Sequence, residues 1–228
     1  MLCRSCGFEN AAGSRFCSNC GVAIATTLAV REERRVATVM FADVAGFTSR
    51  SESLDIEDVG AFLDPVHRLA AAEVTRFGGT IAKFIGDGVM ALFGAPTTYE
   101  DDAERCVRAS FAIQEELSRR RLDDESTVHV RIGIATGRVL VRYSESGQVD
   151  AVGDTVNTAA RLESAAPVDG VIVGSRTYDA TRDTVHYRAA APIVAKGKSV
   201  PLVAWVAEAI AENPSPTPAL WRCLSQAG

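Results

Sequence analysis

Two aspartates in this chain each follow a short apolar run and lie beside or close to a glycine. Asp43 follows Val-Ala-Thr-Val-Met-Phe-Ala, and Asp87 follows Lys-Phe-Ile-Gly and precedes Gly88. Apolar runs of this length predict buried strands, and the glycines predict sharp turns where the strands end. Paired carboxylates suit Mg²⁺ or Mn²⁺, which fill the rest of their shells with water and phosphate oxygens. Each aspartate taken alone is as typical of a turn, where its side chain caps backbone amides.

A helix is expected between the two aspartates, from Ile56 to Phe77, because apolar residues recur there at spacings of three and four. A strand over 80–85, a tight turn at 86–88 and a strand over 89–93 follow it. The strand–helix–strand crossover makes the first two strands parallel, and the hairpin returns the next strand antiparallel beside the first. The end of the first strand and the tip of the hairpin then share one sheet edge, where Asp43 and Asp87 face each other.

Three further groups of residues suit a phosphorylated ligand. The chain after Asp43, residues 44–48, leads towards the helix, so its amides are placed to hold phosphate oxygens. Asn157 and Arg161 are four apart and share one face of a helix that starts near Asp154; the alternative is a pair facing solvent. A basic turn over 195–199 contains Lys196 and Lys198, and a solvated turn explains it equally well.

The segments Phe-Ala-Asp-Val-Ala-Gly-Phe-Thr at 41–48 and Lys-Phe-Ile-Gly-Asp-Gly at 83–88 resemble the two metal motifs of class III nucleotidyl cyclases. The likeness extends over about residues 35–206. It implies an α+β fold with a ferredoxin-like βαββαβ core, in which helices pack on an antiparallel sheet. It also implies two Mg²⁺ or Mn²⁺ ions per active site. The residues expected to hold these ions are Asp43, Val44 and Asp87.

The same resemblance assigns substrate roles to residues on other elements. The motif Asp-x6-Asn-x3-Arg is met by Asp150, Asn157 and Arg161, so Asn157 is expected to orient the ribose and Arg161 to stabilise charge on the α-phosphate. Lys83 and Asp150 would select the base, and this pair favours adenine over guanine; Lys83 alone is also explained as a lysine that extends along its strand to solvent. Triphosphate contacts are expected from Phe47, Thr48 and Lys196.

The implied reaction is that of an adenylate cyclase, which converts ATP into 3′,5′-cyclic AMP and pyrophosphate. Family members place the metal aspartates on one subunit and the base-binding and transition-state residues on its neighbour. The resemblance therefore implies a symmetric head-to-tail homodimer with two complete sites. The alternatives are a guanylate cyclase, or a catalytically silent nucleotide-sensing domain.

Four of the six cysteines lie in the first 24 residues, as two Cys-x-x-Cys pairs each followed by a glycine: Cys3, Cys6, Cys17 and Cys20. Two such pairs, ten residues apart, predict a zinc ribbon with one structural Zn²⁺. A segment this short cannot bury enough core to fold alone, so the metal would supply its folding energy. Two disulfides are the alternative. Zinc ribbons often bind proteins, and in the silent-domain alternative this one would recruit a partner.

Composition limits the remaining possibilities. A net charge of −5 and a ribbon with two basic residues argue against a nucleic-acid partner. No apolar run approaches the roughly 20 residues that span a bilayer, and the N-terminus does not resemble a signal peptide, so a cytoplasmic protein is expected. The predicted organisation is a zinc ribbon over 1–24, a linker over 25–34 that includes part of the charged run 31–35, a catalytic domain over 35–207 and a flexible tail over 208–228.

The rest of the catalytic domain is predicted from the pattern alone. Helices are expected at about 102–121 and from 154, with a short one after 173. Strands are expected at 128–135 and 139–143, joined by a turn at Thr136-Gly-Arg138, and at 170–173, 184–188 and 200–207. Cys106 lies on the apolar side of its helix and is expected to be buried.

Overall fold

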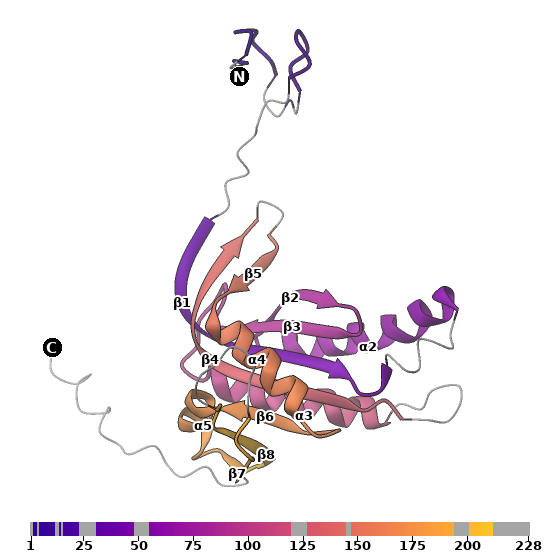
Figure 1. Ribbon diagram of the computed structural model, residues 1–228, viewed down its shortest axis with the longest axis vertical. Coiled ribbons are helices and arrows are strands. Elements are labelled where there is room, and N and C mark those ends of the chain that lie inside the picture. Colours follow the sequence, from indigo (N-terminus) through magenta and orange to yellow (C-terminus); the bar gives the residue numbers. More distant parts are fainter. Residues whose placement is uncertain are drawn as a thin grey trace, which may run out of the picture.

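The computed structural model describes residues 2–3, 5–11, 14, 16–22, 31–47, 55–119, 127–144, 147–193 and 201–211 (Figure 1). Within these ranges all eight strands belong to one sheet, in the order β2-β3-β1-β4-β6-β8-β7, with β5 paired to β4. The elements are β1 (Arg31–Val44), α2 (Ile56–Arg76), β2 (Thr80–Ile85), β3 (Gly88–Phe93), α3 (Asp102–Arg119), β4 (Val130–Tyr143), β5 (Val149–Val152), α4 (Asp154–Ala165), β6 (Val171–Gly174), α5 (Ser175–Thr181), β7 (Val185–Ala189) and β8 (Ala204–Ile210).

The first six elements form the predicted βαββαβ core. β3 pairs antiparallel with both β1 and β2, so β1 and β2 run parallel without touching, as the crossover requires. β4 pairs antiparallel with β1 on its other side. The predicted α+β fold is therefore confirmed, with one departure: β6 pairs parallel with β4, so the sheet is not antiparallel throughout.

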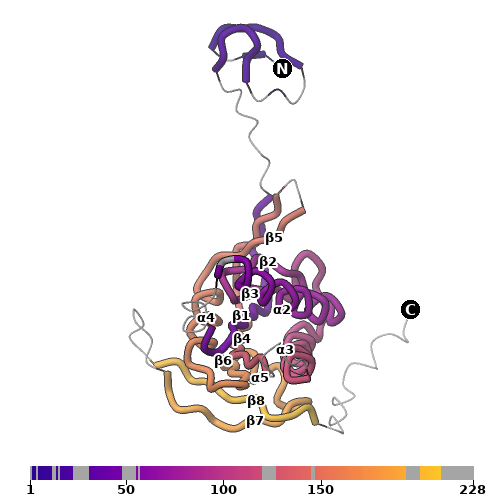
Figure 2. The backbone as a smooth tube through the Cα atoms, turned by 90° about the vertical axis from the view of Figure 1, so that its right-hand side faces the viewer, coloured from indigo at the N-terminus to yellow at the C-terminus, as the bar shows by residue number. Residues whose placement is uncertain are grey.

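The sheet has a helical layer on each face (Figure 2). Successive side chains of β1 point to opposite faces. Met40 and Ala42 join the core beneath α2 and α3, whereas Val39 joins the core beneath α4, where Ala159 and Leu162 are fully buried. By the same alternation Asp43 lies on the face that α4 covers. The two layers thus enclose the strand that carries the first aspartate and hold it rigidly.

The charged run 31–35 is not a lead-in to the first strand, as its composition suggested, but part of it. β1 begins at Arg31, and residues 31–35 pair in register with residues 139–143 of β4. Glu32 accepts a hydrogen bond from Arg142 at 2.7 Å, and Glu33 accepts one from Tyr143 at 2.5 Å. The two glutamates of the run therefore have partners across the strands, while Arg31 and Arg35 pair with Glu33 on their own strand.

The predicted turn at Thr136-Gly-Arg138 was wrong. β4 runs unbroken from Val130 to Tyr143, and the hairpin comes later, where β5 pairs back onto it. Gly137 is needed for packing, because a Cβ there would lie 2.5 Å from Thr155 Oγ1 of α4. The hydroxyl of Thr136 forms hydrogen bonds of 2.9 Å with those of Thr38 and Thr177. Gly137 thus makes room for α4 to pack against the strand and does not mark a turn.

β5 was not predicted; most of the other elements lie close to their predicted bounds, and Cys106 is fully buried as expected. The final strand is displaced by a few residues, to Ala204–Ile210. Among the described helices there is no span of sufficient length and hydropathy to cross a bilayer. Most of the predicted linker and all but four residues of the predicted tail fall outside the described residues.

Candidate metal and nucleotide site

Asp43 and Asp87 come together at one edge of the sheet. Asp43 is the penultimate residue of β1, and Asp87 lies in the tight turn between β2 and β3. Both line the same small hollow beside α2, and the two side chains interact by hydrogen bonding. The crossover and the hairpin therefore place the two carboxylates side by side, as their positions at strand ends predicted.

The electrostatics of this pair suit a cation. Burial, and then the negative charge of Asp87, raise the pKa of Asp43 to about 7; Glu163 acts in the same direction and Arg131 in the opposite one. Two carboxylates that share a half-buried space repel each other when both are ionised. A divalent cation between them would relieve this repulsion, and oxygen ligands are those that Mg²⁺ and Mn²⁺ prefer. The residues thus fit a magnesium or manganese site.

Gly88 provides the space in which the pair meets. A Cβ at this position would lie 3.1 Å from Asp43 Oδ1 and 3.1 Å from the carbonyl oxygen of Ala42. Gly86, on the other side of the turn, has a backbone φ angle of 61°, which residues with a side chain rarely adopt. The two glycines around Asp87 therefore have different roles: Gly86 permits the turn, and Gly88 permits close contact with β1.

Lys83 and Asp150 form a second pair. Lys83 Nζ of β2 donates to Asp150 Oδ1 of β5 at 2.9 Å, and about two-fifths of each side chain is exposed. A bulge in β2 between Ile81 and Lys83 shifts the register there, and bulges commonly re-aim a side chain. An ammonium and a carboxylate held together at a partly open surface can present a donor and an acceptor to one planar ligand.

On α4, Asn157 is exposed and Arg161 is half-buried, whereas Ala159 and Leu162 are fully buried. The helix begins after Gly153, whose φ of 141° few other residues adopt, and whose carbonyl accepts from the amide of Asn157 at 3.3 Å. Arg161 is not among the charges that shift the pKa of Asp43. One chain therefore brings together Asp43 with Asp87, and Lys83 with Asp150, while Asn157 of α4 is exposed.

The loop after Asp43 meets expectation only in part. Val44 and Phe47 bury their side chains, Phe47 by stacking on Phe62 with ring centroids 5.5 Å apart, so only their backbone groups are left to act on a ligand. The amide of Ala45 donates to the carbonyl of His129 at 2.9 Å and is not available to phosphate. Thr48 and Lys196 lie outside the described residues.

Two charged residues near Asp43 were missed by the sequence analysis. Arg131 lies directly opposite Asp43 in the β1–β4 ladder, and Glu163 lies on α4. Burial raises the pKa of Glu163, while the charge of Arg131 lowers it. The sequence showed only that Arg131 alternates with the apolar residues Val130 and Ile132, as any polar residue on the second face of a strand does. Nothing in the spacing relates it to position 43.

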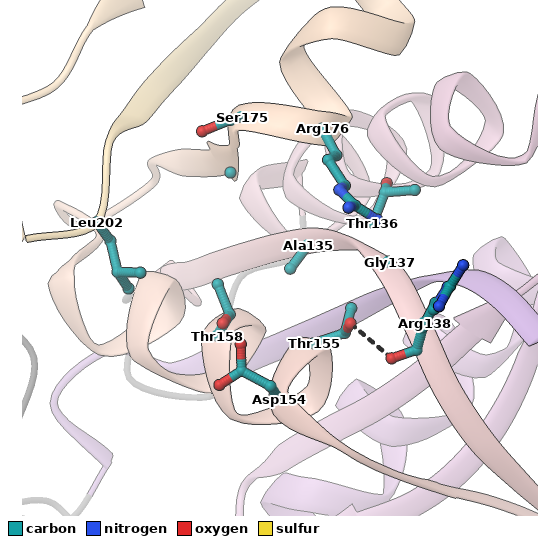
Figure 3. Close-up of a pocket in the computed structure, with 11 residues that line it drawn as sticks. Ala135, Thr136, Gly137, Arg138, Asp154, Thr155, Thr158, Ser175, Arg176 and Leu202 are labelled. Atoms are coloured by element: carbon teal, nitrogen blue, oxygen red, sulfur yellow. Dashed lines mark hydrogen bonds between the residues drawn. The ribbon is translucent and has the colours of Figure 1, made fainter. Parts of the chain in front are cut away.

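A cavity of about 440 Å³ lies elsewhere, between β4, the start of α4 and the start of α5 (Figure 3). Arg138, Asp154 and Arg176 line it together with several hydroxyl groups, and Thr155 donates to the carbonyl of Arg138 at 2.9 Å. None of the motif residues lines this cavity. The candidate site is instead the open sheet edge around Asp43 and Asp87.

The four N-terminal cysteines also converge. Their sulfur atoms all lie within 4.8 Å of one another, with Cys3–Cys20 and Cys6–Cys17 each 3.6 Å apart. Four thiolates around Zn²⁺ at roughly 2.3 Å stand about 3.8 Å from one another, so this cluster has the size of a tetrahedral zinc site. All four are free cysteines, so the disulfide alternative does not hold in this structure.

The two cysteine pairs have the same backbone design. Gly7 donates to the carbonyl of Cys3 at 2.8 Å, and Gly21 to that of Cys17 at 2.9 Å, with φ angles of 73° and 70°. Asn10 joins the two halves: its amide nitrogen lies 3.5 Å from Cys17 Sγ, and its oxygen accepts from the amide of Ser18. The hydrogen bond from the backbone amide of Cys20 is the main reason that the pKa of Cys17 falls to about 6. This favours the thiolate that a metal requires.

Comparison with known proteins finds relatives and similar structures for the sheet domain. The chain is 34% identical over 178 residues to adenylate cyclase 1 of Rhizobium meliloti, which covers 74% of this chain but 27% of the relative. The solved adenylyl cyclase CyaB of P. aeruginosa superposes with a TM-score of 0.70 at 29% identity, over 78% of this chain and 96% of that one. A solved dimeric guanylyl cyclase domain of Blastocladiella emersonii gives a TM-score of 0.69 at 26% identity, over 77% and 97%.

The match to a family extends through the whole sheet. Residues 29–208 match the family described as the adenylate and guanylate cyclase catalytic domain, from just before β1 to within β8. The chain spans about a quarter of the length of its Rhizobium meliloti relative. From its fold, its paired carboxylates and this match, the chain belongs to the family of adenylate and guanylate cyclase catalytic domains.

Proposed function

We propose that this chain acts as an adenylate cyclase, converting ATP into 3′,5′-cyclic AMP and pyrophosphate. The observation that carries the proposal is the crowding of Asp43 and Asp87 at one sheet edge, where burial and mutual repulsion raise the pKa of Asp43 to about 7. The ribose 3′-oxygen forms a bond to the α-phosphorus as the bond to the pyrophosphate oxygen breaks, and the hydroxyl proton is released.

The residues of the chain divide the work. Asp43 and Asp87, with the carbonyl of Val44, would hold two Mg²⁺ or Mn²⁺ ions, which when bound lower the pKa of the attacking hydroxyl and neutralise the triphosphate. Asn157 orients the ribose so that its 3′-oxygen lies in line with the α-phosphorus. Arg161 stabilises the charge that develops on the α-phosphate, because a guanidinium stays cationic and reaches two oxygens.

Lys83 and Asp150 support ATP as the substrate. The carboxylate of Asp150 accepts from the exocyclic amine of adenine, and the ammonium of Lys83 donates to a ring nitrogen. Guanine presents the opposite pattern at these positions. The 2.9 Å ion pair between the two side chains keeps both at one place before a base arrives. Similarity to guanylyl cyclase domains keeps GTP as the competing substrate.

A head-to-tail homodimer would complete each site. Asn157 is exposed, and neither it nor Arg161 is among the groups that shift the pKa of Asp43, so a second copy related by a two-fold axis is the simplest source of Asn157 and Arg161. We further propose that residues 1–24 form a structural zinc ribbon that recruits a protein partner, and that 35–207 form the catalytic domain, with Thr48 and Lys196 completing its phosphate contacts.

The deciding experiment measures product from ATP and from GTP, each with Mg²⁺ and with Mn²⁺, for wild type, Asp43→Ala, Asn157→Ala and an equal mixture of the two variants. Wild type should form cyclic AMP and pyrophosphate, and each variant alone should be inactive. Random exchange makes half of the dimers mixed, each with one intact site of two, so the mixture should regain about a quarter of wild-type activity.

Each contrary result has a distinct meaning. Preference for GTP would make the chain a guanylate cyclase. Binding of ATP with Mn²⁺ but no pyrophosphate would make it a silent nucleotide-sensing domain. An active wild type whose inactive variants do not complement each other would place the whole site within one chain.

A further inference from the structure

A fixed cation stands beside the predicted metal ligand Asp43. Arg131 is its direct partner in the β1–β4 register, so both side chains leave the same face of the sheet. Cβ atoms of such pairs are about 4.5 to 5.5 Å apart. The Nε atom of Arg131 is buried, and no residue in the described ranges accepts a hydrogen bond from it. A guanidinium cannot lose its charge at any ordinary pH, so it would compete with a divalent ion for Asp43.

The packing of α4 brings a third carboxylate to this place. Gly133, two residues beyond Arg131 on the same face of β4, lies directly against the helix: a Cβ there would be 2.0 Å from the backbone nitrogen of Glu163. The helix is therefore fixed against the strand at Glu163. The partly buried carboxylate of Glu163 feels the charges of Arg131 and Asp87, so these groups form one electrostatic cluster with Asp43.

Glu163 does not have the placement of a further metal ligand. Within the described residues, the only group of three or more possible ligand atoms that all lie within 4.8 Å of one another is formed by the four cysteines, so Glu163 does not form such a group with Asp43 and Asp87. Its effect on the ions must therefore pass through a neighbouring side chain or act over a longer distance. The carboxylate of Glu163 accepts a hydrogen bond from the hydroxyl of Ser164 at 3.2 Å, and Arg131 is the cation close enough to lower its pKa.

We propose that Glu163 is a positioning residue that pairs with Arg131 and so keeps this guanidinium from occupying the carboxylate of Asp43, which leaves Asp43 open to Mg²⁺ or Mn²⁺. The proposal rests on the proposed function, because it assumes that Asp43 is a metal ligand. The proposal predicts opposite effects of the two residues on metal affinity. Arg131 lowers the affinity, and Glu163 raises it only while Arg131 is present.

The test is a titration of the full, zinc-loaded chain with Mn²⁺ alone, in which electron paramagnetic resonance counts the free ion. Glu163→Gln should weaken Mn²⁺ binding by about tenfold, the scale of residues that orient metal ligands. Arg131→Gln should tighten it several-fold, a gain that damage to the fold would not produce. Glu163→Asp, which keeps the charge, should stay closer to wild type than Glu163→Gln.

The double variant, Glu163→Gln with Arg131→Gln, shows whether Glu163 affects Mn²⁺ binding through Arg131 or directly. If Glu163 acts through Arg131, adding Glu163→Gln to Arg131→Gln should change Mn²⁺ affinity little, so that the two effects are strongly non-additive. A full tenfold loss in that background would mean that Glu163 acts on the ions directly, and would overturn the proposal. An unchanged affinity in the single variant Glu163→Gln would overturn it as well.

Two further proteins separate this proposal from the proposed function. Asp179→Asn removes one exposed carboxylate on α5 and should leave Mn²⁺ affinity unchanged. Asp87→Asn removes a predicted ligand and should abolish the binding. If wild-type protein binds no Mn²⁺, or if Asp87→Asn binds Mn²⁺ as tightly as wild type, the metal site does not exist and both proposals are wrong. Normal binding that ignores Glu163 and Arg131 would remove only this one. In steady state, Glu163→Gln should raise the Mn²⁺ concentration needed for half activity while kcat at saturating Mn²⁺ is kept.

Discussion

The chain contains two clusters of potential metal ligands, and they are built in opposite ways. The four cysteines lie within 18 residues of sequence and are held by two identical turns whose amides bond back onto the same segment. Asp43 and Asp87 are separated by a helix and a strand, and they meet only because the sheet is formed. The first cluster is a property of local spacing, and the second is a property of the whole fold.

The pKa shifts show what this difference means for the ligands. Backbone amides lower the pKa of Cys6 and that of Cys17, the latter to about 6, whereas the neighbouring thiols and burial raise the pKa of Cys20 to about 12. The ribbon therefore favours the anionic form of part of its ligand set. Burial and Asp87 raise the pKa of Asp43 to about 7, so the folded sheet disfavours the ionised form of this carboxyl group. The ribbon should therefore depend on its metal for structure. The sheet should fold without metal, and a bound cation should reduce the repulsion between its two carboxylates.

The largest expected effect is on catalysis at the sheet edge. Asp43→Asn should lower kcat by at least about 10²- to 10³-fold, the scale for loss of one group that stabilises a developing charge. Stability should not fall, because the change removes a repelling carboxylate from a preformed sheet. Activity and thermal unfolding of the metal-free protein measure the two effects, with Asp64→Asn on the exposed side of α2 as the control. Loss of the folded state would show that the aspartate pair is structural.

The second prediction concerns zinc. Stripping the metal with a chelator, or Cys6→Ser, should expose the amides of residues 2–22 to exchange, because zinc binding supplies roughly 10–16 kcal/mol to folds of this kind. Exchange of β1, β3 and β4 should stay slow. Hydrogen exchange read by mass spectrometry follows both parts in one sample. Protection of Gly7 and Gly21 that persists after zinc is removed would make the ribbon independent of metal and break the comparison.

The same contrast explains what the sequence could and could not predict. The cysteine cluster follows from the spacing of Cys3, Cys6, Cys17 and Cys20, and the meeting of Asp43 with Asp87 follows from one crossover and one hairpin. Periodicity failed at Gly137, where it cannot tell a glycine that turns the chain from one that receives a helix. Arg131 and Glu163 were out of reach because their position depends on the β1–β4 register and on how α4 docks.

A smaller effect is expected from Gly88→Ala, which tests how closely the sheet positions its aspartates. The new Cβ would lie 3.1 Å from Asp43 Oδ1, so the carboxylate must move by a few tenths of an ångström. Small misplacements of this kind are costly in enzymes, and we expect kcat/KM to fall by about tenfold or more. Gly60→Ala is the matched control, because nothing lies within 4 Å of its added methyl group on α2. Equal activity of both variants would mean that the pair tolerates movement.

The smallest effect is on stability, and its sign distinguishes the two clusters. The pKa of Asp43 is about 7 in the folded chain and near 4 when unfolded, so between these values the folded state holds a proton that the unfolded state has lost. The contribution of Asp43 to the stability of the metal-free protein should therefore be greatest below pH 4 and fall as the pH rises to 7. Because Asp43 is only partly buried, the loss should be on the order of 1–2 kcal/mol, less than the full shift implies.

Denaturant unfolding across this pH range, with and without Mn²⁺, measures the effect of Asp43. Asp43→Asn should flatten the fall in stability. Mn²⁺ should reverse it, since a bound cation favours the ionised carboxylate and lowers its pKa. A stability that is indifferent to both changes would mean that the sheet holds these carboxylates without repulsion. The crowding of Asp43 and Asp87 would then no longer argue for a cation at this edge, and the contrast with the ribbon, whose amides already favour the anion, would lose its physical basis.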